Sequence, residues 1–234
     1  LKTGDQVVAS LTWRPGATVT AELVGSSGLG AREVATFVDD DGSGAYTAIW
    51  QVRDGEDGDG LTLRARVAAD DRTRLVAFPG EITVDTTPPR IQSASHDART
   101  ALGVGGVLRV TAVAESGAFG AFSLLRADGA AARADVPMAE TEDGQYAAEF
   151  VVRATDHLLG GTVRVTFEDE VGNQATRDIS RRLTLDTLPP AVESVSHDAE
   201  GALVEGDTVS VTTRGDVGAR GSFAIIVDGD TPFR

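Results

Sequence analysis

The chain has 234 residues and a formal net charge of −15, with 21 Lys and Arg against 36 Asp and Glu, and it contains no Cys. The missing Cys excludes disulfides and thiolate metal sites. The negative charge disfavours nucleic acid and anionic membrane surfaces, which are bound by neutralising phosphates. The sequence holds no apolar run long enough to span a membrane.

Two motifs recur at one spacing. DTTPP begins at Asp85 and DTLPP at Asp186, 101 residues later, and SHDA begins at Ser95 and again at Ser196. A period near a hundred residues indicates an array of whole domains rather than a short-repeat solenoid. We therefore predict three repeats, and we expect the chain to be an excerpt of a longer protein. The repeats span residues 1–85 (first strand missing), 86–186 (complete) and 187–234 (N-terminal part only).

Period-two alternation of apolar residues predicts strands in each repeat. In the first repeat it covers residues 46–52 and 61–67, and in the second it covers residues 146–152 and 163–167. Trp50 and Phe150 occupy the inward phase, so we expect their rings to fill the cores. The second repeat should contain seven strands, which begin near Ile91, Val107, Phe122, Arg133, Gln145, Thr162 and Ala175.

Seven short strands separated by turn signals in about a hundred residues favour an antiparallel Greek-key sandwich. The predicted fold class is all-β, with tandem immunoglobulin-like β-sandwiches of which two are near-complete and one is partial. In the third repeat we expect only the first three strands. Such a half-sandwich should not fold alone, because it lacks a full core to offset the entropy lost when the chain becomes ordered.

The motifs carry a resemblance. VDTTPP, then I/V-x-S-x-S-H-D-A, L-x-x-G-D, VPM…E…G-x-Y and D-x-x-G-N-x-A resemble bacterial Ig-like repeats of large secreted and cell-surface proteins. The resemblance implies a non-enzymatic extracellular spacer or adhesive stalk, with neighbouring domains as partners. Three alternatives stay open: a filament subunit assembled by strand complementation, an accessory region of a large secreted enzyme, and a module that binds glycans or other surface proteins. For such a module, Trp13 in LTWRPG is the main candidate contact.

The histidines do not favour catalysis. His96 and His197 are one repeat position seen twice, and Ser95 and Ser196 precede them directly, so a strand would point the two side chains to opposite faces. A Ser–His–Asp site needs its groups within hydrogen-bond reach. We expect a structural role instead, with Asp97 making an Asx turn and His96 packing against it.

Acidic residues gather where the predicted topology brings loops to the junctions between repeats. Loop carboxylates and amide oxygens are ligands that Ca²⁺ accepts, so the sequence raises the hypothesis of calcium-rigidified junctions. The alternative is that Asp85 and Asp186 cap turns before a Pro-Pro pair that already stiffens the linker. Candidates at the first junction are Asp85, Asp169 and Asn173 with some of Asp54, Asp57 and Asp59; weaker candidates at the second are Asp186, Asp97 and Asp156.

Overall fold

The computed structural model describes residues 1–25, 30–227 and 231–232. Every regular element among these residues is a β-strand, so the predicted all-β class is confirmed. None of the described residues belongs to a helix that could cross a membrane. The chain divides into two compact units, Leu1–Asp186 and Thr187–Arg234. The first unit holds two separate hydrophobic cores, whose buried residues lie within 9–84 and 98–185.

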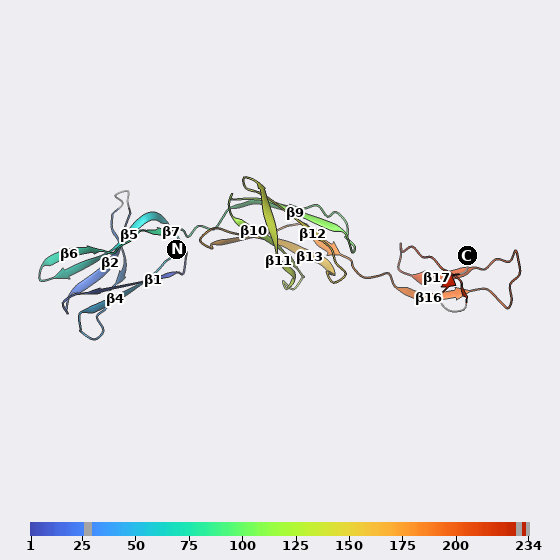
Figure 1. Ribbon diagram of the computed structural model, residues 1–234, viewed down its shortest axis with the longest axis horizontal. Helices are drawn as coiled ribbons and strands as arrows, with labels where there is room; N and C mark the ends of the chain where they lie inside the picture. Colours follow the sequence, from blue (N-terminus) through green and yellow to red (C-terminus); the bar gives the residue numbers. More distant parts are fainter. Residues whose placement is uncertain (26–29, 228–230, 233–234) are drawn as a thin grey trace. The chain divides into compact units, whose positions relative to one another are not determined.

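The first sandwich contains strands β1 to β7 (Figure 1). One layer is the antiparallel pair β1–β4, and the other has the order β3-β2-β5-β6 with β7 beside β5. Among the described residues β1 pairs with β4 alone, so no counterpart of the second repeat's first strand covers its outer edge. The strands span Gln6–Thr12, Thr18–Val24, Arg32–Thr36, Ala45–Gln51, Gly58–Ala69, Arg72–Ala77 and Ile82–Val84.

The second sandwich adds the first strand that the first sandwich lacks. Its layers are β8-β9-β12-β11 and β11-β10-β13-β14, because the twelve-residue strand β11 pairs with β12 at one end and with β10 at the other. The change of layer falls between Met138, which pairs with β10, and Ala139, which pairs with β12. Asp135, with a φ of +50°, lies at a bulge in the β10–β11 pairing, where its N–H donates to the Ser123 hydroxyl at 3.1 Å. The strands β8 to β15 span Ile91–His96, Val107–Ala114, Phe119–Leu125, Ala131–Glu142, Gln145–Val151, Leu158–Glu168, Gln174–Asp178 and Leu183–Leu185.

The predicted strands of the second repeat are all present, and the structure adds an eighth, β15. Leu183 and Leu185 of β15 are fully buried, and β15 pairs with β13 beyond a bulge. The predicted inward phase is confirmed, since Trp50 is 3% and Phe150 8% exposed. The Phe150 ring lies edge-on to Phe122, with 6.4 Å between the centroids. The two layers of each sandwich therefore enclose the alternating apolar side chains, as the sequence predicts.

The described residues of the second compact unit form two short antiparallel pairs. β16 (Val192–His197) pairs with β17 (Val211–Gly215), and β18 (Ile226–Val227) pairs with β19 (Thr231–Pro232). The predicted third strand is present only as the two-residue β18, because residues 220–225, the counterpart of most of β10, form no strand. In the second sandwich β10 is held between β11 and β13, and the described part of this unit supplies no such neighbours. Its apolar side chains, Phe223 among them, stay exposed.

Candidate functional site

The linker between the first two repeats is held by a carboxylate of the first sandwich. Asp57, in the turn before β5, accepts hydrogen bonds from the Thr86 N–H at 2.5 Å and the Thr86 hydroxyl at 2.7 Å. Its second oxygen accepts from the Thr87 hydroxyl at 3.1 Å. These bonds, those from Thr86 above all, hold the pKa of Asp57 below its ordinary value. Asp57 therefore acts as a cap that orders the start of the linker.

The second sandwich holds the same linker from its β13–β14 loop. The buried Asn173 side chain donates to the Asp85 carbonyl at 2.9 Å and to the Asp169 carboxylate at 2.8 Å. Burial opposes the ionised form of Asp169, but hydrogen bonds from Asn173 and the loop backbone outweigh it and lower the pKa. The Lys2 ammonium donates to the Gly172 carbonyl at 2.9 Å. The loop thus contacts both the linker and the start of the first repeat.

The structure therefore brings together Asp85, Asp169 and Asn173, as the topology predicts, and places Asp57 beside the next linker residue. Asp59 lies apart from this group and accepts from the Thr83 hydroxyl at 2.7 Å, and Asp54 is exposed. Within residues 1–25, 30–227 and 231–232, no group of three or more His, Asp or Glu side chains is placed to hold a metal. The carboxylates at the junction accept hydrogen bonds from N–H and O–H groups of the chain itself. Calcium binding there stays a prediction, to be tested by experiment.

The candidates for the second junction have partners inside the second sandwich. Asp156 is buried, and its carboxylate accepts hydrogen bonds from the Arg133 guanidinium at 2.6 Å and from the Arg153 N–H at 2.7 Å. Asp97 accepts from the Arg109 N–H at 3.0 Å, so its side chain extends the pairing of β8 with β9. The predicted Asx turn at Asp97 is therefore wrong. The backbone N–H of Asp186 donates to the Leu102 carbonyl at 2.9 Å.

The histidine of the second repeat has a structural position. His96 is buried, and its Nε2 is 3.1 Å from the Arg181 carbonyl, to which it donates. The preceding Ser95 hydroxyl lies 3.1 Å from the Thr111 hydroxyl instead. The two side chains thus have different partners, as the alternation of a strand requires. His96 is therefore buried with a backbone partner, but that partner is Arg181 and not the predicted Asx turn at Asp97.

One tyrosine in each sandwich fixes the turn between two core strands. The Tyr46 hydroxyl donates to the Arg14 carbonyl at 3.2 Å and accepts from the Ala17 N–H at 3.0 Å. Tyr146 makes the same pair of bonds to Glu115 and Ala118, at 2.7 and 3.1 Å. In the first sandwich this bond anchors the turn that carries Trp13 and Arg14.

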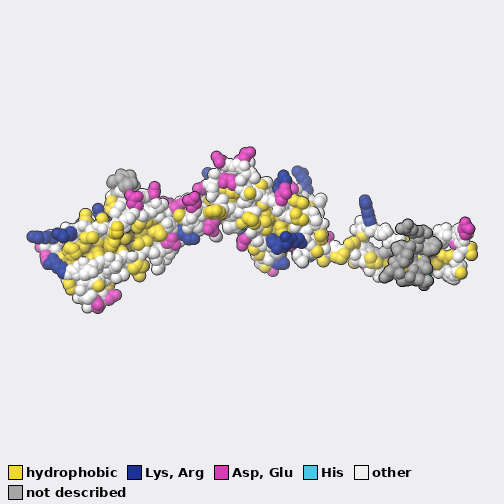
Figure 2. Space-filling model, in the orientation of Figure 1, with side chains coloured by type: hydrophobic (Ala, Val, Ile, Leu, Met, Phe, Trp, Pro, Cys, Tyr) yellow, Lys and Arg dark blue, Asp and Glu magenta, His cyan; other side chains and the backbone are white. Residues whose placement is uncertain are grey.

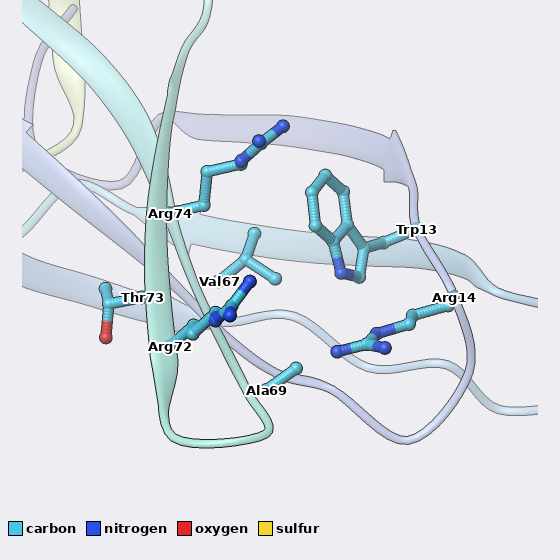
Figure 3. A pocket seen from close by; sticks show the side chains of 7 residues that line it. All are labelled: Trp13, Arg14, Val67, Ala69, Arg72, Thr73 and Arg74. Atoms are coloured by element: carbon cyan, nitrogen blue, oxygen red, sulfur yellow. The ribbon is translucent and has the colours of Figure 1, made fainter.

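Opposite that turn stands the hairpin between β5 and β6. Asp70 and Asp71 have φ of +47° and +59°, the pattern of a two-residue type I′ turn. Alternation along β6 then points Arg72 and Arg74 to one side and Thr73 to the other, as Figure 3 shows. The turn and the hairpin together form an open pocket of about 620 Å³, the Trp13 pocket. Its lining residues are Trp13, Arg14, Val67, Ala69, Arg72, Thr73 and Arg74.

The Trp13 pocket is a basic site on an acidic chain. Figure 2 shows dark blue Lys and Arg side chains gathered at the β6 end of the first sandwich. The Arg74 guanidinium lies 5.8 Å from the centre of the Trp13 ring, and Arg14 pairs with Asp70. Sequence reasoning singled out Trp13 but not Arg72 and Arg74, because they are about sixty residues away along the chain. The sequence signal that could have identified them is the alternation of Arg72 and Arg74 around Thr73, which puts two cationic side chains on one face of a strand.

No family model and no curated protein matches this sequence. Among solved structures, the titin domains z1z2 in complex with telethonin are 12% identical over 81% of this chain and 92% of that chain, with a TM-score of 0.27. The tetra-tandem repeat in the extending region of a large adhesion protein is 16% identical over 91% of this chain and 63% of that one, with a TM-score of 0.34. The immunoglobulin-like fold assigned to this chain follows from its own strand pairings.

Proposed function

We propose that this chain is a non-enzymatic structural or adhesive spacer, built of tandem immunoglobulin-like domains, in a larger secreted or surface protein of a bacterium. The observation that carries the proposal is the linker after the first repeat, which both sandwiches hold by hydrogen bonds: Asp57 holds Thr86, and Asn173 holds Asp85. A linker fixed from both sides transmits force and orientation between domains. The sequence motifs shared with bacterial Ig-like repeats support the extracellular location.

The linker itself is short and restricted. Thr86 and Pro89 are buried, and the two prolines Pro88 and Pro89 fix φ near −65°. Proline-rich linkers act as semi-rigid spacers, whereas Gly- and Ser-rich linkers are flexible coils. Chain stiffness at this point therefore comes from backbone restriction and from the Asp57 and Asn173 hydrogen bonds together.

Pulling the chain between its ends in a single-molecule force experiment tests the proposal. We expect two separate unfolding events, one for each sandwich, because the two cores are distinct. Each event should lengthen the chain by on the order of 300 Å, for about a hundred residues at 3.3–3.6 Å each. A single event, or extension without a force peak, would refute a mechanical role.

The junction has its own test. Asn173→Ala removes the bond to the linker at Asp85 together with the bond to Asp169 inside the loop. Gln174→Ala is the matched control, because it removes an exposed side chain that bonds only Glu168 in the same loop. In the wild type, NMR relaxation should give both sandwiches one common rotational correlation time. Asn173→Ala should give them separate, shorter values, whereas Gln174→Ala should not. Independent tumbling already in the wild type would contradict the fixed linker.

A further inference from the structure

The Trp13 pocket is chemically unlike the equivalent position in the second sandwich. Strand pairing aligns Arg72 and Arg74 with Asn173 and Ala175, since Arg74 faces Val67 as Ala175 faces Phe167. By the 101-residue repeat, Trp13 and Arg14 correspond to Ala114 and Glu115. These four of the seven lining residues therefore change type between repeats whose cores are alike. Shared folding requirements do not account for the Trp13 pocket, which points to a role in binding.

Trp13, Arg72 and Arg74 each carry a polar group without a partner of the kind it requires. The Trp13 Nε1–H is buried and has no hydrogen-bond acceptor among the described residues. A buried donor without an acceptor costs about 1–3 kcal/mol and requires an explanation. Arg72 is exposed, and no ion pair joins it or Arg74 to a described carboxylate. The pocket therefore presents two unneutralised guanidinium groups, and a buried indole N–H without an acceptor lies beside them.

Figure 3 shows how these groups converge. The side chains of Arg74 and Arg72 extend from β6 toward Trp13, and the side chain of Arg14 extends toward the same space from the opposite turn. Guanidinium groups match carboxylates in a planar, two-bond geometry, and they also stack on aromatic faces. The pocket volume lies in the range of small-ligand sites. Because the pocket supplies donors and an aromatic ring, its ligand must supply acceptor oxygens, a negative charge and an apolar face.

We propose that the Trp13 pocket binds an acidic saccharide, with a uronate carboxylate held by Arg72 and Arg74 and the sugar ring against Trp13. A uronate residue combines the three required features, since its carboxylate is anionic, its oxygens accept hydrogen bonds, and its C–H face is apolar. This site goes beyond the spacer role, because it gives the first repeat a target of its own. The net charge of −15 repels polyanions elsewhere on the chain, which confines binding to this basic end.

Tryptophan fluorescence tests the proposal directly, because the chain has two tryptophans and only one lines the pocket. Trp50 is buried in the core and donates to Glu56, so it adds a constant background. Trp50→Phe removes that background, and the second repeat already tolerates Phe150 at the equivalent position. In this variant, titration with galacturonic acid tetramer should change the Trp13 emission in a saturable way. The uncharged control, maltotetraose, should not.

Charge variants make the test specific. Arg72→Ala should weaken tetramer binding by roughly tenfold or more, as the loss of one hydrogen bond to a charged group implies. Arg99→Ala removes the same charge from an exposed loop of the second sandwich and should leave binding unchanged. Thermal unfolding of both variants checks that they fold. Trp13→Phe keeps a ring but removes the N–H donor, and calorimetry should show weaker binding.

Three results would overturn the proposal. The first is no saturable change with the uronate tetramer. The second is equal binding of maltotetraose, or binding that Arg72→Ala leaves unchanged. The third is binding of poly-glutamate, or self-association of the chain abolished by Arg72→Ala, without any binding of the uronate tetramer. That third result would assign the pocket to an acidic protein surface instead.

Discussion

The Tyr146 hydroxyl offers a clean measurement of one buried hydrogen-bond pair. It donates to the Glu115 carbonyl at 2.7 Å and accepts from the Ala118 N–H at 3.1 Å, and the residue is 2% exposed. Its ring packs edge-on to Phe167, with 4.7 Å between centroids. Tyr146→Phe removes the hydroxyl and retains the ring contact, so any loss of stability belongs to the two hydrogen bonds.

The expected loss follows from what the substitution leaves behind. A backbone carbonyl and a backbone N–H lose their partner in a partly buried turn, and leaving such groups unsatisfied costs about 1–3 kcal/mol. We expect a loss of about 2 kcal/mol in the free energy of unfolding of the second sandwich. For a module of about a hundred residues, 1 kcal/mol corresponds to about 4–8 °C, so its unfolding midpoint should fall by roughly 8–16 °C.

Differential scanning calorimetry measures the midpoint, and hydrogen exchange at the Ala118 amide reports the turn itself. Tyr46→Phe is the internal control, because Tyr46 makes the same bonds to Arg14 and Ala17 in the first sandwich. Its effect should be confined to the transition of that sandwich. A midpoint of Tyr146→Phe within about one degree of wild type, with Ala118 still protected, would refute the reasoning that the hydroxyl anchors the turn.

Three further outcomes are expected. Asp156→Ala leaves Arg133 without its partner and should destabilise the second sandwich by about 3 kcal/mol in urea unfolding, with exposed Glu142→Ala near zero. Asp57 and Asp169 have lowered pKa values in the folded state, so their stabilisation is present above the unfolded value near 4 and is lost as pH falls through the folded values. The protection factor of the Thr86 amide should therefore fall below about pH 4, and a protection factor that does not change with pH would contradict this. Calcium bound at the first junction should raise the unfolding midpoint by mass action, and a midpoint that neither Ca²⁺ nor chelator moves would reject that hypothesis.

Local patterns predicted the strands because burial acts residue by residue along a strand. Tyr46, Ala48 and Trp50 alternate with outward-facing neighbours, among them the exposed Ile49, and the structure buries all three. β15 escaped prediction because three residues, Leu183 to Leu185, are too few to show a period and directly precede the linker motif. The third strand of the last repeat is shorter than predicted, because Phe223 and Ile225 carry the right alternation but need neighbouring strands to pair with.

At the junction, the sequence predicted that Asp85, Asp169 and Asn173 come together, but not which groups their side chains bind. The topology argument placed Asp85 near Asn173, and the structure joins them by a hydrogen bond. Composition could not show that Asp57 receives two donors from Thr86, because a carboxylate in a turn has the same sequence signature whether it binds a cation or caps a backbone. The difference lies in which donors come within reach, and only the fold sets that distance.

The sequence by itself determined the all-β class, the 101-residue repeat and the inward phase of each strand, because these depend on periodicity within short segments. The tertiary structure decided which distant residues meet. Arg72 and Arg74 face Trp13 because the two-residue turn at Asp70 and Asp71 sets the register of β6 against β5. In the second repeat the equivalent strand, β13, is followed by a longer loop, which holds the linker instead. A hairpin's length and register, and not its composition, thus fix which side chains share a pocket.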